Sequence, residues 1–238
     1  RWYSGSGIYR QVTLDVLPAG ARLARWGVGA WTRRIANGSG EVQVTTRIEA
    51  PDPTLKLITR LRDAQNRVVA QASAPAAAEV MQALSVRGPR LWSPDDPYLY
   101  RLETELRRGD IVTDSMVQDF GLRIVTIDAK QGLAINVKRT VLRGGCIHHD
   151  NVLLGACAYP DAAEPRVRLL KARGFNAIRS SHKPASRALA KACDRLGMLV
   201  IDEAFDMWNV GKNPDDYSRH FAQDWQDPLS AMVLSARN

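Results

Sequence analysis

Residues 140–150 read TVLRGGCIHHD, residues 176–182 read NAIRSSH and residues 198–204 read MLVIDEA, and these three stretches decide the fold. Each is a short apolar run that ends in polar, titratable residues. Between them lie two segments with helical spacing of apolar residues, 162–173 and 185–196, and each is followed by a glycine, Gly174 or Gly197. Asp161 and Glu164 offer the first of these helices a capping box. Asp227 and Pro228 are expected to open a last helix further along the chain. Strands that alternate with helices are typical of a parallel sheet.

The polar residues that end the three predicted strands form one group. They are His148, His149 and Asp150, then Arg179 and His182, then Asp202 and Glu203. In a parallel α/β barrel the chemistry gathers at the carboxyl ends of the strands, because the loops that follow them converge there. The pattern therefore predicts the first part of a (β/α)8 TIM barrel with a polar site at one end. A closed barrel takes about 250 residues, so we expect this chain to be a piece of a longer protein.

Upstream of the barrel units, residues 21–119 have the pattern of an antiparallel β-sandwich. Short alternating segments are separated by turn-rich sequence, as at residues 37–40 and 108–110. Strands at this spacing favour an immunoglobulin-like two-sheet sandwich. The alternating segments are ARLARWGVGAW (21–31), EVQVTTRIEA (41–50), TLKLITRL (54–61), RVVAQASA (67–74), YLYRLETEL (98–106) and DIVTDSMV (110–117). One further strand is expected over residues 8–16, and Trp92 is expected to fill a core.

Composition narrows the function class. The chain has 238 residues, a net charge of +8 and 45% hydrophobic residues, which fits a globular protein. A basic chain suggests nucleic acid as a partner, but the arginines are scattered, so we expect no nucleic-acid partner. No run approaches the roughly 18 apolar residues of a membrane span, so we expect no membrane partner either. The three cysteines have no metal-ligand spacing, and their odd number argues against a complete disulfide framework. Cys193 is expected to be a buried free thiol.

Two pairs of adjacent residues suggest chemistry that their geometry disfavours. Neighbours on a strand point to opposite faces, so His148 and His149 are poorly placed to share one metal ion. For the same reason Asp202 and Glu203 cannot form the carboxyl pair, roughly 5–5.5 Å apart, that a retaining glycosidase needs. We expect Arg179 to form an ion pair with one of these two carboxylates.

Several stretches together resemble glycoside hydrolase family two, which includes β-galactosidases, β-glucuronidases and β-mannosidases. Residues 6–14 resemble the last strand of that family's sugar-binding jelly roll, and residues 91–106 resemble the end of its immunoglobulin-like domain. Five further stretches resemble the first part of that family's barrel: FGLRIVTID (120–128), LRGGCIHHD (142–150), LLKARGFNAIRSSHKP (169–184), CDRLGMLVIDEAFDMW (193–208) and SARN (235–238). The resemblance implies three domains: residues 1–20 of a jelly roll, a sandwich over 21–119, and the amino-terminal part of a barrel over 120–238.

The resemblance also assigns roles to residues. His148, Arg179 and His182 match positions that bind the terminal sugar, and His149, Asp202 and Glu203 are expected to support that site. The family's acid/base glutamate follows strand four and its nucleophile follows strand seven, so no catalytic residue is expected within these 238 residues. No cofactor and no metal are expected.

The sequence departs from the family pattern at four positions. Cys146 stands where the family often has Asn, and Val137 replaces the usual Gly of an Asn-Gly turn. Gln11 occupies a position that is Asp in some galactosidases, where it assists a sodium site. Met207 falls where some members have a magnesium-binding Glu. These departures bear on the sugar subsite and on metal dependence.

The resulting hypothesis is that the chain is the middle part of a retaining exo-β-glycosidase of the β-galactosidase type. Such an enzyme hydrolyses terminal non-reducing β-D-glycosides, so its partner is a carbohydrate substrate. The alternatives are a β-glucuronidase or β-mannosidase of the same family, a non-catalytic carbohydrate-binding relative, or a metal-dependent hydrolase. The 238 residues alone are expected to be inactive, and whether the full-length protein forms a homo-oligomer is left open.

Overall fold

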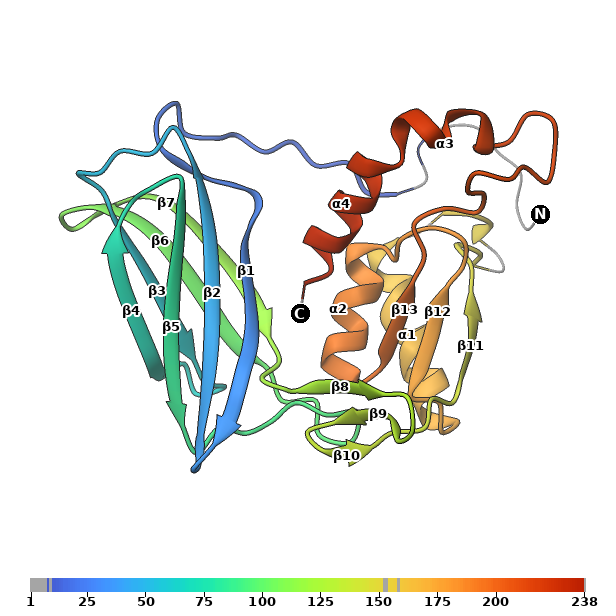
Figure 1. Cartoon of the computed structure of the whole chain (residues 1–238), viewed down its shortest axis with the longest axis horizontal. Coiled ribbons are helices and arrows are strands. Elements are labelled where there is room, and N and C mark those ends of the chain that lie inside the picture. The colour runs from blue at the N-terminus through green and yellow to red at the C-terminus, as the bar shows by residue number, and fades with distance from the viewer. Residues whose placement is uncertain (1–7, 9, 152–153, 158, 238) are drawn as a thin grey trace. The chain divides into compact units, whose positions relative to one another are not determined.

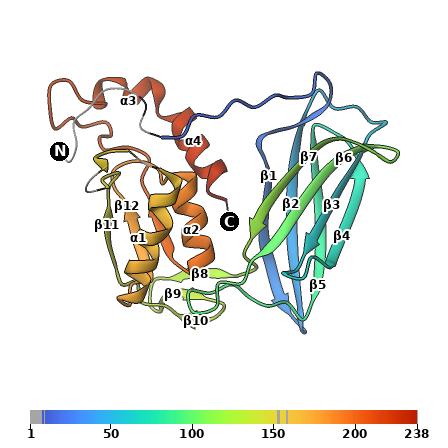
Figure 2. The ribbon, with the colours of Figure 1, turned by 180° about the vertical axis from the view of Figure 1, so that it is seen from behind.

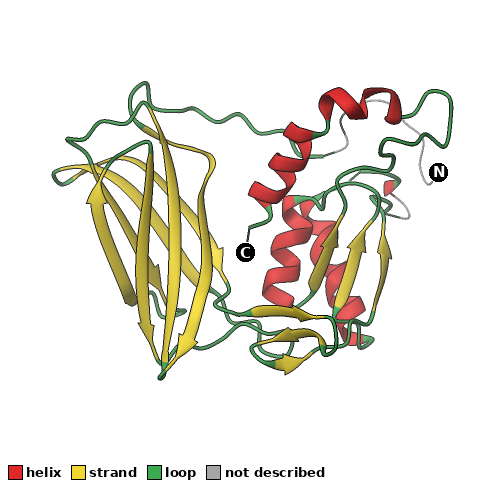
Figure 3. Cartoon of the chain, in the orientation of Figure 1, coloured by secondary structure: helices red, strands yellow, loops and turns green. Residues whose placement is uncertain are grey.

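The computed structural model describes residue 8 and residues 10–151, 154–157 and 159–237. The chain divides into two compact units. One comprises residues 15–140, and the other comprises residues 141–236 together with an amino-terminal segment that includes residues 10–14. Figure 3 shows that strands dominate the first unit and that helices and strands alternate in the second. Each unit is described below by itself.

The first unit contains the predicted immunoglobulin-like sandwich (Figure 1). Its two sheets are antiparallel, with strand orders β1-β2-β5 and β4-β3-β6-β7. The strands are β1 (Arg22–Ala36), β2 (Ser39–Glu49), β3 (Lys56–Arg62), β4 (Val68–Pro75), β5 (Glu79–Arg87), β6 (Tyr100–Arg108) and β7 (Ile111–Phe120). Alternate residues point inward, so Val42 and Val44 of one sheet and Leu57 and Leu102 of the other belong to a single buried core.

Strand β5 is absent from the predicted segments. Its inward positions are Val80, Gln82, Leu84 and Val86, and the polar Gln82 interrupts the apolar alternation. Gln82 is nevertheless buried, because its Oε1 accepts a hydrogen bond of 2.6 Å from the Thr59 hydroxyl of the facing sheet. A buried amide is tolerated when it has such a partner, and a single sequence does not reveal the partner.

A small antiparallel sheet, with strand order β10-β9-β8, follows the sandwich. It consists of β8 (Val125–Asp128), β9 (Gly132–Ile135) and β10 (Lys138–Arg139). Trp92 is only 2% exposed, as expected of a core residue, and the Arg123 guanidinium lies 4.6 Å from its ring centroid.

The second unit contains three parallel strand–helix units. Its sheet has the order β11-β12-β13 (Gly144–Ile147, Ala177–Ser180 and Leu199–Asp202). Helices α1 (Pro160–Ala172) and α2 (Arg187–Leu196) pack on this sheet through Val167, Ile178 and Leu189 (Figure 2). The three predicted strands and both helices are confirmed. Cys193 is a free thiol that is 1% exposed, and burial raises its pKa to about 12.

Helix α2 ends as predicted, because Gly197 adopts a left-handed conformation with φ of 70°. Helix α1 begins differently from the prediction. Asp161 and Glu164 were expected to form a capping box, but the helix begins at Pro160, whose fixed φ suits the first helical position. Its cap residue makes no side-chain hydrogen bond, and Glu164 is instead paired with Arg168 and Arg195.

Two further differences concern the ends of the chain. The strand expected over residues 8–16 is absent from the part of this segment that the structure describes, residues 8 and 10–16. Residues 11–18 have no secondary structure, and no strand in the described part of the chain hydrogen-bonds with them. A strand needs such a neighbour. The last helical region contains two helices, α3 (Ser218–Asp224) and α4 (Gln226–Ser235), and only the second was expected. No described helix is long and apolar enough to cross a membrane.

Candidate active site

The register of the parallel sheet places the predicted strand ends side by side. Cys146 is level with Arg179 and Ile201, and Ile147 is level with Ser180 and Asp202. The residues that follow these positions therefore leave the sheet at one edge, as the carboxyl ends of parallel strands do. Figure 1 shows this common edge at the upper ends of β11, β12 and β13.

Four side chains meet at this edge and are called here the strand-end cluster: His148, Arg179, His182 and Glu203. Glu203 is its centre, since one carboxylate oxygen forms an ion pair with Arg179 and the other lies 3.0 Å from Nδ1 of His182. The His148 and His182 rings contact each other edge to face, with centroids 5.4 Å apart. Glu203 is 19% exposed, whereas Arg179 and His182 are about twice as exposed, so the basic groups are the accessible part.

The electrostatics of the cluster favour a neutral His148. Burial lowers the pKa of its imidazole, and the nearby Asp150 only partly opposes that effect. A neutral imidazole has one donor and one acceptor nitrogen. Together with the Arg179 guanidinium and the Glu203 carboxylate, it offers the mixture of donors and acceptors that sugar hydroxyls require.

Cys146 also contacts the strand-end cluster, and the sequence did not reveal this contact. Arg179 Nη1 lies 3.3 Å from Cys146 Sγ, so one guanidinium contacts both the thiol and Glu203. The Ser181 hydroxyl and then Arg179 lower the pKa of this exposed thiol. The sequence showed only that Cys146 departs from the family pattern. The parallel register, which pairs it with Arg179, was the signal that could have found the contact.

The loop that carries His182 is held by backbone contacts. Asp202 Oδ1 accepts a 2.7 Å hydrogen bond from the Ala185 amide, and Ser180 Oγ donates to the Lys183 carbonyl over 2.8 Å. Burial raises the pKa of Asp202, and the Ala185 amide opposes that effect. Asp202, the last residue of β13, and Glu203, just beyond it, therefore have different partners. The Ser181–His182 peptide bond is cis.

His149, next to His148 in the chain, contacts a residue outside the cluster. Its Nε2 lies 2.9 Å from Nη2 of Arg10, and burial lowers its pKa to about 4. On the other side of the same loop, Arg166 of α1 donates to the carbonyl oxygens of His148 and Asp150. The loop after β11 is therefore fixed from two directions.

An aromatic cluster follows β13 and was not singled out from the sequence. Phe205 stacks on Tyr217 at 5.0 Å and contacts Trp208 and Phe221 edge to face, and Phe221 in turn stacks on Trp225. Trp208 remains 52% exposed. In Figures 1 and 2, α3 lies at the same end of the sheet as the strand-end cluster. The four-residue spacing of Tyr217, Phe221 and Trp225 is the sequence pattern that could have indicated this aromatic cluster.

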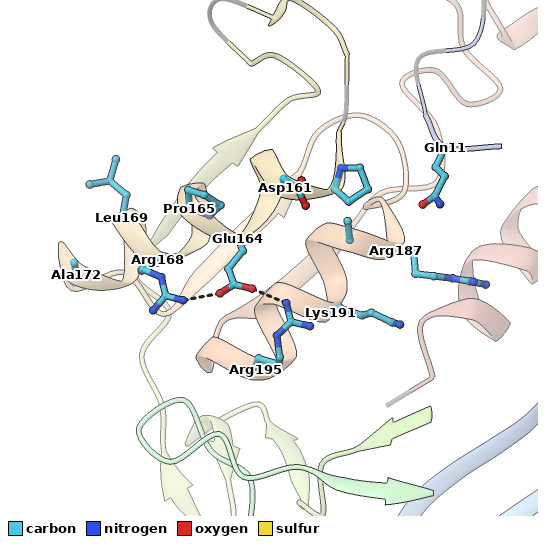
Figure 4. Close-up of a pocket in the computed structure, with 12 residues that line it drawn as sticks. Gln11, Asp161, Glu164, Pro165, Arg168, Leu169, Ala172, Arg187, Lys191 and Arg195 are labelled. Atoms are coloured by element: carbon cyan, nitrogen blue, oxygen red, sulfur yellow. Dashed lines mark hydrogen bonds and ion pairs between the residues drawn. The ribbon is translucent and has the colours of Figure 1, made fainter. Parts of the chain in front are cut away.

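A hollow lies between α1 and α2 and is lined by residues of both helices (Figure 4). Arg168 and Arg195 converge there on Glu164, and Arg187, Lys191 and Gln11 line the rest. None of the four strand-end residues lines it. Because catalytic residues in this fold lie at the carboxyl ends of strands, we assign the site to the strand-end cluster and not to the hollow between α1 and α2.

The described residues contain no group of three or more His, Cys, Asp or Glu side chains placed to hold a metal ion. Met207, at a position where some family members have a metal-binding Glu, is 4% exposed and packs as an apolar residue.

A β-sandwich followed by parallel strand–helix units with polar strand ends is typical of a multidomain protein with a TIM-barrel domain. Two family models identify the family of this protein. Glycosyl hydrolases family 2 matches residues 30–123, and the TIM barrel domain of glycosyl hydrolases family 2 matches residues 125–228. The chain belongs to glycosyl hydrolase family 2.

Three relatives illustrate the similarity. The β-galactosidase BoGH2A of Bacteroides ovatus is 36% identical over the whole of this chain and 29% of its own length. A β-glucuronidase of Bacteroides fragilis is 29% identical over 72% of this chain and 24% of its own length. A solved family 2 member from Bacteroides cellulosilyticus is 42% identical with a TM-score of 0.90, over the whole of this chain and 32% of that one. The chain thus spans less than a third of each.

Proposed function

We propose that this chain is part of a retaining exo-β-glycosidase that removes a terminal β-D-galactosyl residue, and that the strand-end cluster binds that sugar. The observation that carries the proposal is the bridge from Glu203 to both Arg179 and His182, with His148 beside it. This arrangement fixes two accessible basic side chains at the edge where a barrel enzyme holds its substrate.

The proposed roles follow from the chemistry of each group. Arg179 presents donors to sugar hydroxyls, His182 presents the ring nitrogen that does not face Glu203, and His148 contributes a neutral ring nitrogen. Glu203 orients Arg179 and His182 and does not transfer a proton, since both of its oxygens are already engaged by basic groups. Such pre-positioning lowers the barrier by holding the substrate close to its reacting geometry.

The two catalytic carboxylates are proposed to come from parts of a longer protein. In a retaining mechanism one carboxylate attacks the anomeric carbon, and the other protonates the leaving oxygen and then activates water. Asp150, Asp202 and Glu203 are carboxylates at the described strand ends, and each has another partner. A β-galactosidase is the first candidate because of the similarity to the Bacteroides ovatus enzyme, and the similarity to a β-glucuronidase makes that activity the second.

A panel of aryl β-glycosides tests this proposal. The longer protein that contains this chain should release the aryl group fastest from the β-galactoside, with the β-glucuronide and β-mannoside as comparisons. A preference for the glucuronide would select the second candidate. No release from any β-glycoside would reject the glycosidase assignment and favour a non-catalytic carbohydrate-binding protein.

A further inference from the structure

Arg10 connects two loops of the candidate site that are far from it in sequence. Its Nη2 donates to the Pro184 carbonyl at 2.6 Å and lies 2.9 Å from His149 Nε2. These partners are 174 and 139 residues away along the chain. Arg10 belongs to the compact unit that contains the strand-end cluster, and its side chain is partly buried there.

The two contacts of Arg10 lie next to the two histidines of the cluster. His149 adjoins His148 in the loop after β11, and Pro184 is two residues beyond His182 in the loop after β12. One guanidinium nitrogen thereby joins the loops whose histidine rings meet with centroids 5.4 Å apart. The loop after β12 is also held by Asp202 through the Ala185 amide, so Arg10 and Asp202 fix consecutive residues.

The hydrogen bond also determines the form of His149. A guanidinium only donates, so His149 Nε2 must accept, and the ring is neutral with its proton on Nδ1. Burial and the adjacent Arg10 charge lower the pKa of His149 to about 4, which agrees with that neutral form. A neutral His149 places no second positive charge beside Arg10 or beside His148.

We infer that Arg10 is a positioning residue for sugar binding: it ties the loops of His148 and His182 to each other and so sets the separation of the two rings. The expected loss of activity rests on the proposed function, whereas the contacts of Arg10 with His149 and Pro184 do not depend on it. Displacements of about 1 Å in a site can lower a rate roughly a hundredfold, so the effect should be measurable.

The test compares three variants of the longer protein that contains this chain: R10M, R10K and the control R173M. Arg173 is exposed and lies just after α1, at the opposite end of the sheet from the strand-end cluster. R10M should lower kcat/KM for an aryl β-glycoside at least tenfold. R10K should recover part of this loss, because an ammonium can donate to both acceptors, and R173M should stay within twofold of the wild type.

A second readout does not depend on activity. The His149 pKa, followed by NMR with ¹³C-labelled histidine and assigned with H149N, should rise in R10M, because the guanidinium that lowers it is gone. A merely structural contribution of Arg10 to folding would not produce both effects. An unchanged His149 pKa, or a kcat/KM for R10M within twofold of R173M, would overturn the inference.

The outcomes also separate this inference from the proposed function. If the wild-type protein hydrolyses no β-glycoside, the proposed function fails, and the His149 titration alone decides for or against the Arg10 contact. If R10M does not fold, R10K takes its place, and it must still lower kcat/KM at least threefold for the inference to stand.

Discussion

At the scale of single residues, the candidate site depends on one carboxylate that organises two basic side chains. Glu203 is more buried than either partner, and both of its oxygens are engaged. Buried charges of this kind are costly unless paired, so the ion pair with Arg179 and the bond to His182 support each other. The site is therefore more sensitive to the charge of Glu203 than to its volume.

Replacing Glu203 by Gln tests this dependence. The amide keeps the shape but loses the charge that holds Arg179, so kcat/KM of the longer protein should fall by about tenfold to a hundredfold. The matched control is Glu164→Gln, which removes a carboxylate that also bridges two arginines, Arg168 and Arg195, but lies between α1 and α2. Steady-state kinetics on both variants provide the measurement, and equal losses would contradict the assignment.

His149 should make stability depend on pH. Its pKa is about 4 in the folded state and 6.5 in an ordinary environment, so between these values the unfolded chain binds a proton that the folded chain does not. Stability should be complete above about pH 6.5 and fall as the pH drops toward 4, by about 1–2 kcal/mol once solvent screening of this partly exposed group is allowed for. Denaturant titrations at pH 7 and pH 5 should show a smaller loss for H149N than for wild type. The exposed His220 provides the control, and H220N should retain the full loss.

The sequence could predict which residues end the strands but not which of them touch. His148 and His149 lie in the loop after β11, and Glu203 lies just beyond β13, so the different partners of these neighbours are set by the loops. The sequence could not choose between Asp202 and Glu203 as the partner of Arg179, because that depends on which carboxylate faces the same side of the sheet. The contacts of Arg10 and Cys146 were not predicted either, since they join positions 33 to 174 residues apart.

At the scale of secondary-structure elements, local patterns predicted most of the structure. Parallel strands and their helices were identified because apolar runs and glycine stops are local signals. Strand β5 was missed because Gln82 occupies an inward position and is satisfied by Thr59 of the opposite sheet. The capping box at Asp161 and Glu164 was wrong because Pro160 starts α1 earlier and distant Arg195 competes for Glu164.

The turn between β9 and β10 offers a direct test at this scale. Asn136 and Val137 both have positive φ, 50° and 64°, and Val137 is 94% exposed. A β-branched residue is strained in this region, which glycine adopts freely. Val137→Gly should therefore stabilise the unit by about 1 kcal/mol, as measured by its unfolding midpoint. Val125→Gly, in the neighbouring strand β8, should destabilise it, since glycine weakens a strand interior. A destabilised V137G would contradict the turn geometry.

At the scale of the whole molecule, the chain comprises two compact units and spans less than a third of each relative described above. The family models meet near residue 124, whereas the compact units divide between residues 140 and 141. The domain boundaries 1–20, 21–119 and 120–238 remain our proposal. The sequence predicted the order of the folds because each leaves a local pattern, but a domain border is set by long-range contacts.

The isolated 238-residue chain should show no glycosidase turnover. Its described strand ends carry Asp150, Asp202 and Glu203, and each of these carboxylates is engaged by another partner. A retaining mechanism needs two carboxyl groups about 5–5.5 Å apart across the scissile bond. The measurement is release of p-nitrophenol from the β-galactoside by the purified chain, with the longer protein as positive control. Turnover by the chain alone would show that its own carboxylates are catalytic.

A crystal structure of the longer protein with a trapped sugar, formed from a 2-deoxy-2-fluoro-β-galactoside, tests the central claim most directly. The account predicts that hydroxyl groups of the bound sugar lie within hydrogen-bonding distance of at least two of His148, Arg179 and His182, with Glu203 still bridging Arg179 and His182. A sugar bound elsewhere, with none of these three side chains in contact with it, would contradict the account.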